Sequence, residues 1–250
     1  MINNFFRPAA VLFLFITFAA GKAESWTLPK KCDQVILGLT EDWESSCAEL
    51  QLWEREGKKW RPASKPWPAR IGKEGLAWGR GVHPPPPPAG VPMKEEGDWR
   101  SPAGVFELGD AYGHADSPPA GAAWAYHPFT EKDLWIEDPA SEYYNMRMSL
   151  DHLPETEWEK KQQMRRRDPA HRLKIFIRHN AIPNILPGAG SSIFFHIWRL
   201  NGDKPTAGCT AMSAKKLREM LRWLKPESRP LFILLPEDFY SCVRAEWDLP

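Results

Sequence analysis

The sequence of 250 residues carries almost no net charge, because 33 lysines and arginines stand against 32 aspartates and glutamates. No long basic run stands out along the chain. Nucleic-acid binding that is driven by the release of counterions needs an excess of positive charge on the protein. We therefore expect no nucleic acid among the partners of this protein.

The sequence also lacks the spacings that metal sites use. Its seven histidines are scattered, and neither a His-x-x-x-His nor a Cys-x-x-Cys pattern occurs. His171 and His179 lie too far apart on one strand to be obvious co-ligands. We therefore expect neither a metal ion nor another cofactor.

Long apolar runs are absent except near the N-terminus. Arg7 precedes an apolar run from Pro8 to Ala20, and Gly21-Lys22-Ala23 offers a cleavage pattern of small residues. The run is shorter than the roughly 20 apolar residues of a transmembrane helix, and no lipid-carrying cysteine follows it. We expect residues 1–23 to be a signal peptide, with no membrane span after its cleavage and with export to the periplasm or cell envelope.

Cysteine is scarce, with four residues at positions 32, 47, 209 and 242. An even number in an exported chain usually means two disulfides. If Cys209 is instead a free catalytic thiol, the other three can form one disulfide at most. Cys32 and Cys47 would not lie opposite each other in a hairpin of residues 35–39 and 48–53, and the sequence does not choose the pair.

What the sequence does contain predicts a single β-rich α+β domain over residues 24–250, with no internal repeats. Apolar segments of strand character occupy residues 34–39, 48–56, 173–178, 192–200 and 231–235. Ser213 is a plausible N-cap for a helix over residues 214–225, and further short helices are expected within residues 155–167 and near Trp247. Residues 101–106 are expected to form a turn that leads into a short strand, and residues 110–145 a long irregular region.

The candidate site combines a strand histidine with a cysteine in a glycine-containing turn. Strand periodicity places Phe194, His196 and Trp198 on one face. Cys209 is expected just before a helix start, where backbone N–H groups lower the pKa of a thiol. Amides near Gly208 and Cys209 could form an oxyanion hole, and the Thr206 hydroxyl can orient the turn. Acyl transfer through a thioester is the chemistry that such residues favour.

These residues resemble the catalytic domain of the L,D-transpeptidases of the YkuD-like group. The upstream run Ser101-Pro102-Ala103-Gly104-Val105-Phe106 is similar to the family element Thr-Pro-x-Gly-x-Phe. The segments 143–145 and 179–191 resemble a proteobacterial branch of the group. The resemblance runs from about Gln34 to the C-terminus and implies a β-sandwich or barrel-type catalytic domain.

The resemblance implies that Cys209 is the nucleophile, that His196 is its base and that Gly208 belongs to the oxyanion turn. The thiol would attack the carbonyl between a meso-diaminopimelate centre and the terminal D-alanine of a tetrapeptide stem of peptidoglycan. The acyl group would then pass to an amine acceptor and form a cross-link. We expect the protein to be a monomer.

Six further residues are predicted to contact the substrate: Thr206, Trp198, Tyr144, Asn145, His179 and Asn180. Structural roles are open for five of them. Tyr144 and Asn145 could instead cap a loop. His179 and Asn180 could hydrogen-bond the turn at residues 187–188, and Trp198 could pack in the core.

The sequence departs from the family pattern at three positions. Ala207 replaces the histidine that usually precedes the glycine and cysteine, Ala211 replaces a polar residue, and Ile197 replaces the glycine after the strand histidine. The thiol and the imidazole are kept, so acyl-enzyme chemistry is still expected. The departures alter the polarity of the cleft, and with it the acceptor and the stem position that is attacked.

Two other functions fit the sequence. The same thioester could pass to water, which would make the protein an L,D-carboxypeptidase. Alternatively, the 13 tryptophans could stack on sugars in a non-catalytic cell-wall-binding protein that is held together by disulfides. That second alternative requires Cys209 to be disulfide-bonded.

Overall fold

The computed structural model of the chain describes residues 26–84, 87–165 and 168–250. The predicted signal peptide, residues 1–23, lies outside the described residues. In the described part of the chain, no helix has both the length and the apolar character that crossing a membrane requires.

Strands dominate the structure. They are β1 (Gln34–Thr40), β2 (Cys47–Glu56), β3 (Lys59–Pro62), β4 (Trp67–Arg70), β5 (Leu76–Trp78), β6 (Ser101–Gly113), β7 (Tyr126–Pro128), β8 (Asp133–Trp135), β9 (Arg147–Ser149), β10 (Leu173–Ile177), β11 (Phe194–Ile197), β12 (Thr210–Met212) and β13 (Leu231–Pro236). The α-helices are α1 (Glu157–Gln162), α2 (Ala214–Trp223) and α3 (Glu237–Val243), and the 3₁₀ helices are η1 (Pro169–His171), η2 (Leu200–Gly202) and η3 (Pro226–Ser228).

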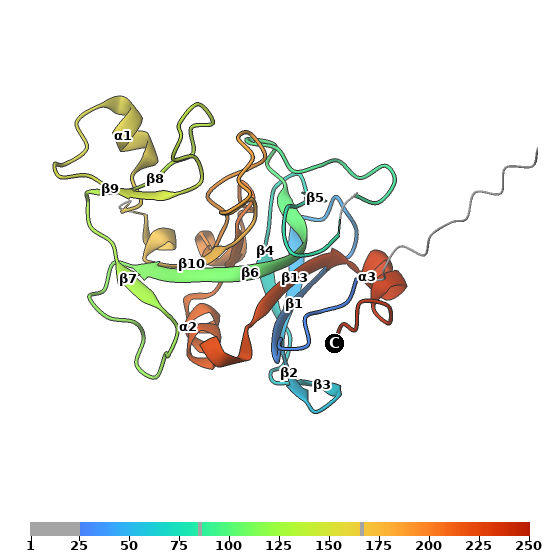
Figure 1. The fold of residues 1–250 in the computed structure, drawn as a ribbon. Coiled ribbons are helices and arrows are strands. Elements are labelled where there is room, and N and C mark those ends of the chain that lie inside the picture. The colour runs from blue at the N-terminus through green and yellow to red at the C-terminus, as the bar shows by residue number, and fades with distance from the viewer. Residues whose placement is uncertain (1–25, 85–86, 166–167) are drawn as a thin grey trace, which may run out of the picture.

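Eight of these strands close into a barrel (Figure 1). Around the barrel their order is β1, β13, β6, β10, β11, β12, β4 and β2, and β2 pairs back with β1. Strand β3 extends this sheet beyond β2, and β5 and β7 each pair with β6. The predicted fold class, a β-rich α+β domain of barrel type with a few short helices, is therefore confirmed.

The barrel forms because its strands carry apolar side chains on the face that points inward. The predicted hairpin of β1 and β2 is confirmed, with Val35 opposite Trp53. Every residue of β13 is buried, since β13 lies between β1 and β6 and contacts α3. Closure leaves few exposed strand edges, which are sites of unwanted pairing.

Helix α2 covers one end of the barrel. Its N-cap is Ser213 as predicted, and the Ser213 hydroxyl accepts a hydrogen bond from the Lys216 N–H at 3.2 Å. The residues at helical spacing, Leu217, Met220 and Leu221, are fully buried in the main core. The apolar face of α2 therefore packs against the barrel, and α2 contacts β11.

Strand β6 differs from the sequence-based expectation. A turn at residues 101–106 and an irregular region from residue 110 were expected, but β6 is continuous from Ser101 to Gly113. The glycines of this run serve close packing within a strand and do not form turns. A Cβ on Gly104 would lie 2.1 Å from His83 Cε1, and a Cβ on Gly109 would lie 2.7 Å from Phe176 Cδ1.

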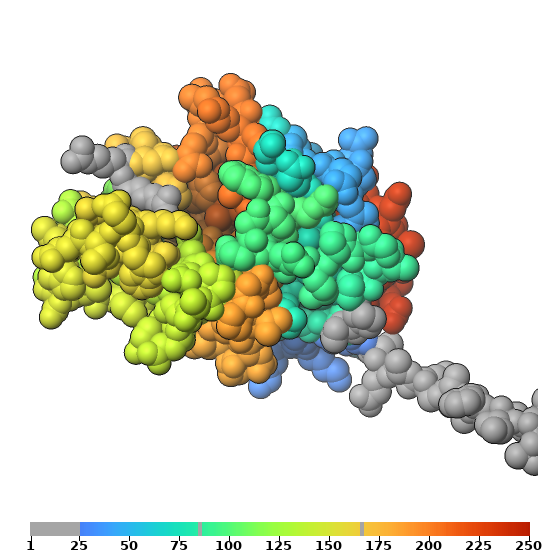
Figure 2. Space-filling view, turned by 90° about the horizontal axis from the view of Figure 1, so that it is seen from above, coloured from blue at the N-terminus to red at the C-terminus, as the bar shows by residue number. Residues whose placement is uncertain are grey.

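A lobe of residues 129–165 stands beside the barrel. It contains the two-stranded sheet of β8 and β9 and the helix α1. Figure 2 shows this lobe in yellow, with a recess between it and the rest of the molecule. Within the described part of residues 155–165, the helical composition produces the short helix α1, which begins with a capping box at Thr156 and Glu159.

All four cysteines are free thiols in this structure. Cys32 is buried, whereas Cys47 and Cys242 are exposed. Cys47 lies opposite Arg70 on the neighbouring strand β4. The disulfide-held arrangement that a purely structural role of Cys209 would require is therefore not present.

Candidate active site

A cleft of about 590 Å³ lies where the lobe meets the barrel. It is the recess of Figure 2, and the rim of the barrel and the lobe both contribute side chains to it. The lining includes Cys209, His196, Lys174, Trp135 and Phe194. The thiol and the imidazole that the sequence predicted as a pair therefore face one cleft.

Cys209 lies at the floor of this cleft, beside an aromatic cluster. Its Sγ accepts a hydrogen bond from the Phe194 N–H at 3.4 Å and donates one to the Ser192 carbonyl oxygen at 3.3 Å. The cluster beside it consists of Tyr112, Phe129, Trp135, Met164, Phe176 and Phe194. The aromatic cluster therefore lies directly against the thiol.

The expectation that a helix start lowers the pKa of the Cys209 thiol is wrong. Cys209 is followed by strand β12, and α2 begins only at Ala214, so no helix N-terminus points at the sulfur. Burial raises the pKa of the Cys209 thiol, and the Phe194 N–H and Lys174 offset this only in part. The resting thiol is therefore neutral, and it would need a base in order to act as a nucleophile.

His196 is the candidate for such a base. Its Nδ1 donates a hydrogen bond to the Ile197 carbonyl oxygen at 2.8 Å, because that oxygen can only accept. Nδ1 therefore carries a proton, and the neutral ring has its lone pair on Nε2. Burial lowers the pKa of His196 to about 4, which keeps the ring neutral and able to accept a proton.

A second histidine stacks on His196. The ring centroids of His171 and His196 are 5.5 Å apart with an interplanar angle of 23°. Arg199 donates to His171 Nε2 at 3.0 Å, and Asp168 holds the same guanidinium through a 2.6 Å ion pair. Because a guanidinium only donates, His171 Nε2 must be an acceptor, and the ring beside His196 is neutral.

The turn that carries Cys209 is held by the Thr206 side chain. Thr206 Oγ1 accepts from the Gly208 N–H at 3.1 Å and donates to the Cys209 carbonyl oxygen at 2.6 Å. Thr206 is also fixed to the chain at residues 71–73: its N–H donates to the Ile71 carbonyl oxygen at 2.8 Å, and its carbonyl oxygen accepts from the Lys73 N–H at 2.9 Å. Thr206 therefore shapes the nucleophile turn, and it also lines the cleft.

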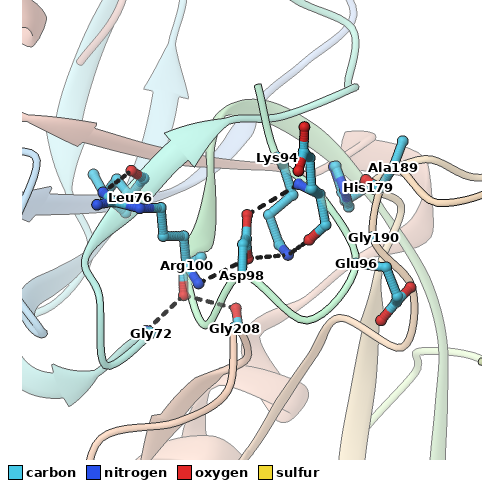
Figure 3. Close-up of polar contacts among 12 residues, drawn as sticks. Gly72, Leu76, Lys94, Glu96, Asp98, Arg100, His179, Ala189, Gly190 and Gly208 are labelled. Carbon is cyan, nitrogen blue, oxygen red and sulfur yellow. Dashed lines mark hydrogen bonds and ion pairs between the residues drawn. The ribbon is translucent and has the colours of Figure 1, made fainter. Parts of the chain in front are cut away.

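Ser101 joins the same turn to the start of β6. Its hydroxyl donates to the Gly208 carbonyl oxygen at 2.6 Å and accepts from the Gly72 N–H at 2.9 Å. Figure 3 shows Gly208 and Gly72 on either side of this link. Gly208 has a φ of +146°, and a Cβ there would lie 3.0 Å from the Arg100 carbonyl oxygen, so glycine fits both the conformation and the close approach.

The two backbone amides expected for an oxyanion hole, those of Gly208 and Cys209, differ in their hydrogen bonding. The Gly208 N–H is taken by Thr206, so it is not available to a reacting oxygen. Among the residues that the structure describes, the Cys209 N–H makes no hydrogen bond. The backbone amide of Cys209 is therefore the candidate donor to a developing oxyanion, and Gly208 acts by setting its direction.

Asn145 does not line the cleft, but it hydrogen-bonds two residues that do, Trp135 and Ser192. Its Oδ1 accepts from Trp135 Nε1 at 3.0 Å and from the Ser192 N–H at 2.9 Å. Its Nδ2 donates to the carbonyl oxygens of His179 and Asn180. The neighbouring Tyr144 is buried, and its hydroxyl donates to the Glu96 carboxylate. Both residues support the cleft wall from behind.

His179 and Asn180 also lie behind the wall, where they order the loop of residues 181–190 (Figure 3). His179 Nδ1 accepts from the Arg80 N–H at 3.0 Å, and Nε2 donates to the Ala189 carbonyl oxygen at 2.9 Å. Burial lowers the pKa of His179 to about 3. Asn180 bonds the backbone of residues 186 and 190.

Trp198 does not line the cleft either. It lies just beyond the end of β11, and its ring packs against Gly202, where a Cβ would be 2.9 Å from Trp198 Cε3. Of the six predicted substrate contacts, only Thr206 lines the cleft. The other five have partners within the protein, so their contact with a substrate stays a prediction.

Sequence reasoning missed Lys174, which is 6 % exposed. It lies on β10 directly opposite His196 on β11. Its Nζ is 5.2 Å from the centroid of Phe194 and 5.6 Å from that of Phe129. A lysine in the otherwise apolar strand Leu173–Ile177 was the available signal, because strand alternation places it on the His196 face.

The charged groups of the cleft are of both signs. Lys161, Lys174 and Arg199 face it together with Glu96 and Glu137. Lys94 also lines it but is held by Asp98 through a 2.6 Å ion pair (Figure 3). Within the described ranges, no group of histidine, cysteine, aspartate and glutamate residues is arranged to hold a metal ion.

The structure is thus a β-barrel domain in which a cysteine and a histidine line the same cleft. The model of the L,D-transpeptidase catalytic domain named YkuD matches residues 50–233, and the chain belongs to this family. No curated protein matches the chain.

Two solved structures are similar at low sequence identity. One is the helical cell shape determining protein Pgp2 from Campylobacter jejuni, at 15 % identity and a TM-score of 0.40, with 81 % of this chain and 47 % of that chain covered. The other is Bdellovibrio bacteriovorus Bd1075, at 14 % identity and a TM-score of 0.39, with 90 % of this chain and 56 % of that chain covered. This chain thus spans about half the length of each.

Proposed function

We propose that the protein is an exported L,D-transpeptidase that acts on peptidoglycan stem peptides through a thioester on Cys209. The observation that carries the proposal is the free thiol of Cys209 in the same cleft as His196, whose Nδ1 is bonded to the protein. Membership of the family supplies the substrate class. Such a substrate places the protein in the periplasm or cell envelope.

The proposed reaction follows from these groups. His196 Nε2 accepts the thiol proton while Cys209 Sγ attacks the carbonyl between the diaminopimelate centre and the terminal D-alanine. The Cys209 N–H donates to the oxygen as it gains charge. The imidazolium then returns the proton to the leaving D-alanine amine, and the carbon–nitrogen bond breaks to leave a thioester.

The second half of the reaction consumes that thioester. An acceptor amine attacks the same carbonyl and loses a proton to His196, and the tetrahedral intermediate expels the Cys209 thiolate, which recovers this proton. The products are a new amide and the free enzyme. The neutral thiol and neutral imidazole suit this proton exchange, because neither group has to be recharged between turnovers.

The charges of the cleft fit such a substrate. A stem peptide carries carboxylates and, at diaminopimelate, an ammonium group. Lys174 offers positive charge near His196, and Glu96 and Glu137 offer negative charge elsewhere in the lining. A cleft with both signs can orient a zwitterionic peptide in one direction only.

Hydrolysis is the second candidate, and one observation favours it. Ala207, where the family usually has histidine, is exposed and lines the cleft beside Cys209. A small side chain there leaves room for a water molecule near the thioester. The thiol and base would act identically, but the product would be a trimmed stem.

The first experiment is the intact mass of the mature protein after incubation with a carbapenem, whose strained lactam carbonyl reacts with an activated thiol. We expect one covalent adduct that is lost in Cys209→Ala. The matched control is Cys242→Ala, which removes an exposed thiol on α3 and should keep the adduct. An adduct that survives in Cys209→Ala, or none in the wild type, contradicts the proposal.

A soluble tetrapeptide stem then separates the two outcomes. In the presence of an acceptor amine, a transpeptidase yields a product whose mass is that of donor plus acceptor minus D-alanine. A carboxypeptidase yields the tripeptide even when the acceptor is in excess. Formation of the tripeptide alone would assign hydrolysis to this protein.

A further inference from the structure

A second hollow, also of about 590 Å³, lies next to the catalytic cleft. Leu173 and Ile197 line this hollow, whereas their chain neighbours Lys174 and His196 line the catalytic cleft. Because neighbouring residues of a strand point to opposite faces, the two hollows are separated by the thickness of β10 and β11. The 3₁₀ helix η1 also joins them, with Pro169 in one lining and His171 in the other.

The hollow is positively charged. Three arginines line it, Arg172 before β10 and Arg218 and Arg222 on α2, and no aspartate or glutamate does. All three are exposed. Over the described ranges, none of the three forms an ion pair with a carboxylate. Arg218 and Arg222 lie one helical turn apart, so they present their guanidinium groups side by side.

Part of the wall is apolar. Pro118, Pro119 and Tyr126 line it together with Leu173 and Ile197. Arg222 is steadied by its Nε, which donates to the Ala120 carbonyl oxygen at 2.9 Å. Guanidinium groups match the geometry of a carboxylate, which accepts two parallel hydrogen bonds. The chemistry that fits is therefore a carboxylate carried on a partly aliphatic segment.

We propose that this hollow, the arginine pocket of Arg172, Arg218 and Arg222, binds a second stem peptide of the peptidoglycan. The assignment of peptidoglycan rests on the proposed function. A stem peptide presents carboxylates on a short aliphatic chain, which matches three guanidinium groups beside an apolar wall. Peptidoglycan repeats its stems along each strand, so an enzyme that holds one stem in its cleft can hold a neighbouring stem in an adjoining pocket. The arginine pocket then keeps the enzyme on its polymer between turnovers.

The test measures binding of the mature Cys209→Ala protein to purified peptidoglycan by co-sedimentation at low salt. Three exposed ion pairs are expected to contribute about tenfold in affinity, so R172Q/R218Q/R222Q should lower binding about tenfold. The matched control is K58Q/K59Q/K65Q, which removes the same charge from exposed lysines in and near the hairpin of β2 and β3 and should change binding less than twofold. Equal losses in both triple variants would overturn the proposal, because non-specific charge would then explain the binding.

Two further experiments identify the chemical class of the ligand. The charge-keeping variant R172K/R218K/R222K should recover only part of the binding if carboxylates are held by guanidinium forks. Vesicles that contain phosphatidylglycerol probe the other source of anionic groups. If the arginine variant loses vesicle binding and keeps peptidoglycan binding, the pocket is a phosphate site and the assignment of a stem peptide is wrong.

Carbapenem acylation separates this proposal from the proposed function. The arginine variant on the Cys209-containing protein should be acylated at the wild-type rate, since none of its three changes lines the catalytic cleft. If the wild type is not acylated but still binds peptidoglycan through the arginines, the proposed reaction at Cys209 is wrong. The proposed binding by the arginine pocket is then still supported. If acylation is normal and the arginine variant binds peptidoglycan like the wild type, only the pocket proposal fails.

Discussion

The catalytic cleft and the loop of residues 179–190 each contain a buried histidine, and the two rings are bonded differently. His179 uses both ring nitrogens inside the protein, on the Arg80 N–H and on the Ala189 carbonyl oxygen. His196 uses Nδ1 on the Ile197 carbonyl oxygen, and no hydrogen bond to its Nε2 occurs within the described residues. Of these two rings, only that of His196 lines the cleft with Cys209.

Burial lowers the pKa of both rings, to about 4 for His196 and to about 3 for His179. A strongly shifted pKa is often used to find functional residues. Here burial shifts the pKa of the residue that orders a loop as strongly as that of the cleft histidine. The ring nitrogen that the protein leaves without a hydrogen bond distinguishes the proposed base from the structural residue.

The largest expected effect is on catalysis by the cleft histidine. His196→Gln removes the proton acceptor and should lower the rate of carbapenem acylation about 10²–10⁴-fold. The melting temperature should change little. His127→Gln is the control, because His127 pairs with Asp110 away from the cleft. A rate within threefold of the wild type would contradict the role of His196.

The next largest effect is on the stability contributed by the loop histidine. His179→Leu leaves the buried Arg80 N–H and Ala189 carbonyl oxygen without their partner, which should cost about 2–5 kcal/mol of unfolding free energy. Denaturant titration measures this cost. The acylation rate of the molecules that remain folded should stay close to that of the wild type. A large loss of rate without a loss of stability would instead give His179 a part in the chemistry.

A smaller effect is expected for the turn that presents the thiol. Thr206→Val keeps the shape of the side chain but breaks its bonds to the Gly208 N–H and the Cys209 carbonyl oxygen. The turn then loses its geometry, and acylation should slow about 10–100-fold. Thr40→Val is the matched control, since the buried Thr40 hydroxyl also bonds a backbone oxygen, that of Asp42. Equal rates in the two variants would show that the turn does not need Thr206.

The last expected effect is the dependence of the unfolding free energy on pH, which is spread over more than two pH units. The folded pKa values of His196 and His179 lie below the ordinary value of 6.5, so the unfolded chain binds more protons than the folded protein just below pH 6.5. The unfolding free energy should therefore rise with pH between about 4 and 6.5 and fall on acidification, by up to about 1.4 kcal/mol per pH unit for each ring.

Removing one ring tests that slope. His196→Gln should remove the contribution of one histidine ring from the slope of unfolding free energy against pH. The unfolding free energy above pH 7 should stay nearly unchanged. Denaturant titrations at intervals from pH 4.5 to 7.5 supply the measurement. A slope identical to that of the wild type would mean that the His196 ring titrates alike in the folded and unfolded chains.

The sequence predicted the fold well and singled out His196 and Cys209, because both the fold and these two residues are marked by local patterns. The hairpin of residues 34–56, the strands at β10, β11 and β13 and the N-cap Ser213 all follow from alternation and capping. His196 and Cys209 stood out as a strand imidazole and a thiol beside a glycine. The structure brings them to one cleft, as the strand face of His196 indicated.

The sequence could not predict what depends on distant contacts. Gly104 was expected in a turn, but it lies inside β6, where the missing Cβ atoms of Gly104 and Gly109 make room for His83 and Phe176. Helix α2 begins after β12, so the thiol gains no helix dipole and burial raises its pKa. Asn145 gave no signal of the groups that it bonds, since those groups come from other parts of the chain, whereas the sequence did offer a turn contact near residues 187–188 for His179 and Asn180.

Because the barrel closes through pairings between distant segments of the chain, the site around Cys209 forms late in folding. The nucleophile turn is held by residues 71–73 and by Ser101, which are far from it in sequence, and β13, near the end of the chain, fills the place between β1 and β6. Pairings over such long sequence separations form slowly, because the intervening chain must first be ordered. A chain that is still being translated therefore carries Cys209 without its turn. The proposed acyl transfer would become possible only in a completed molecule.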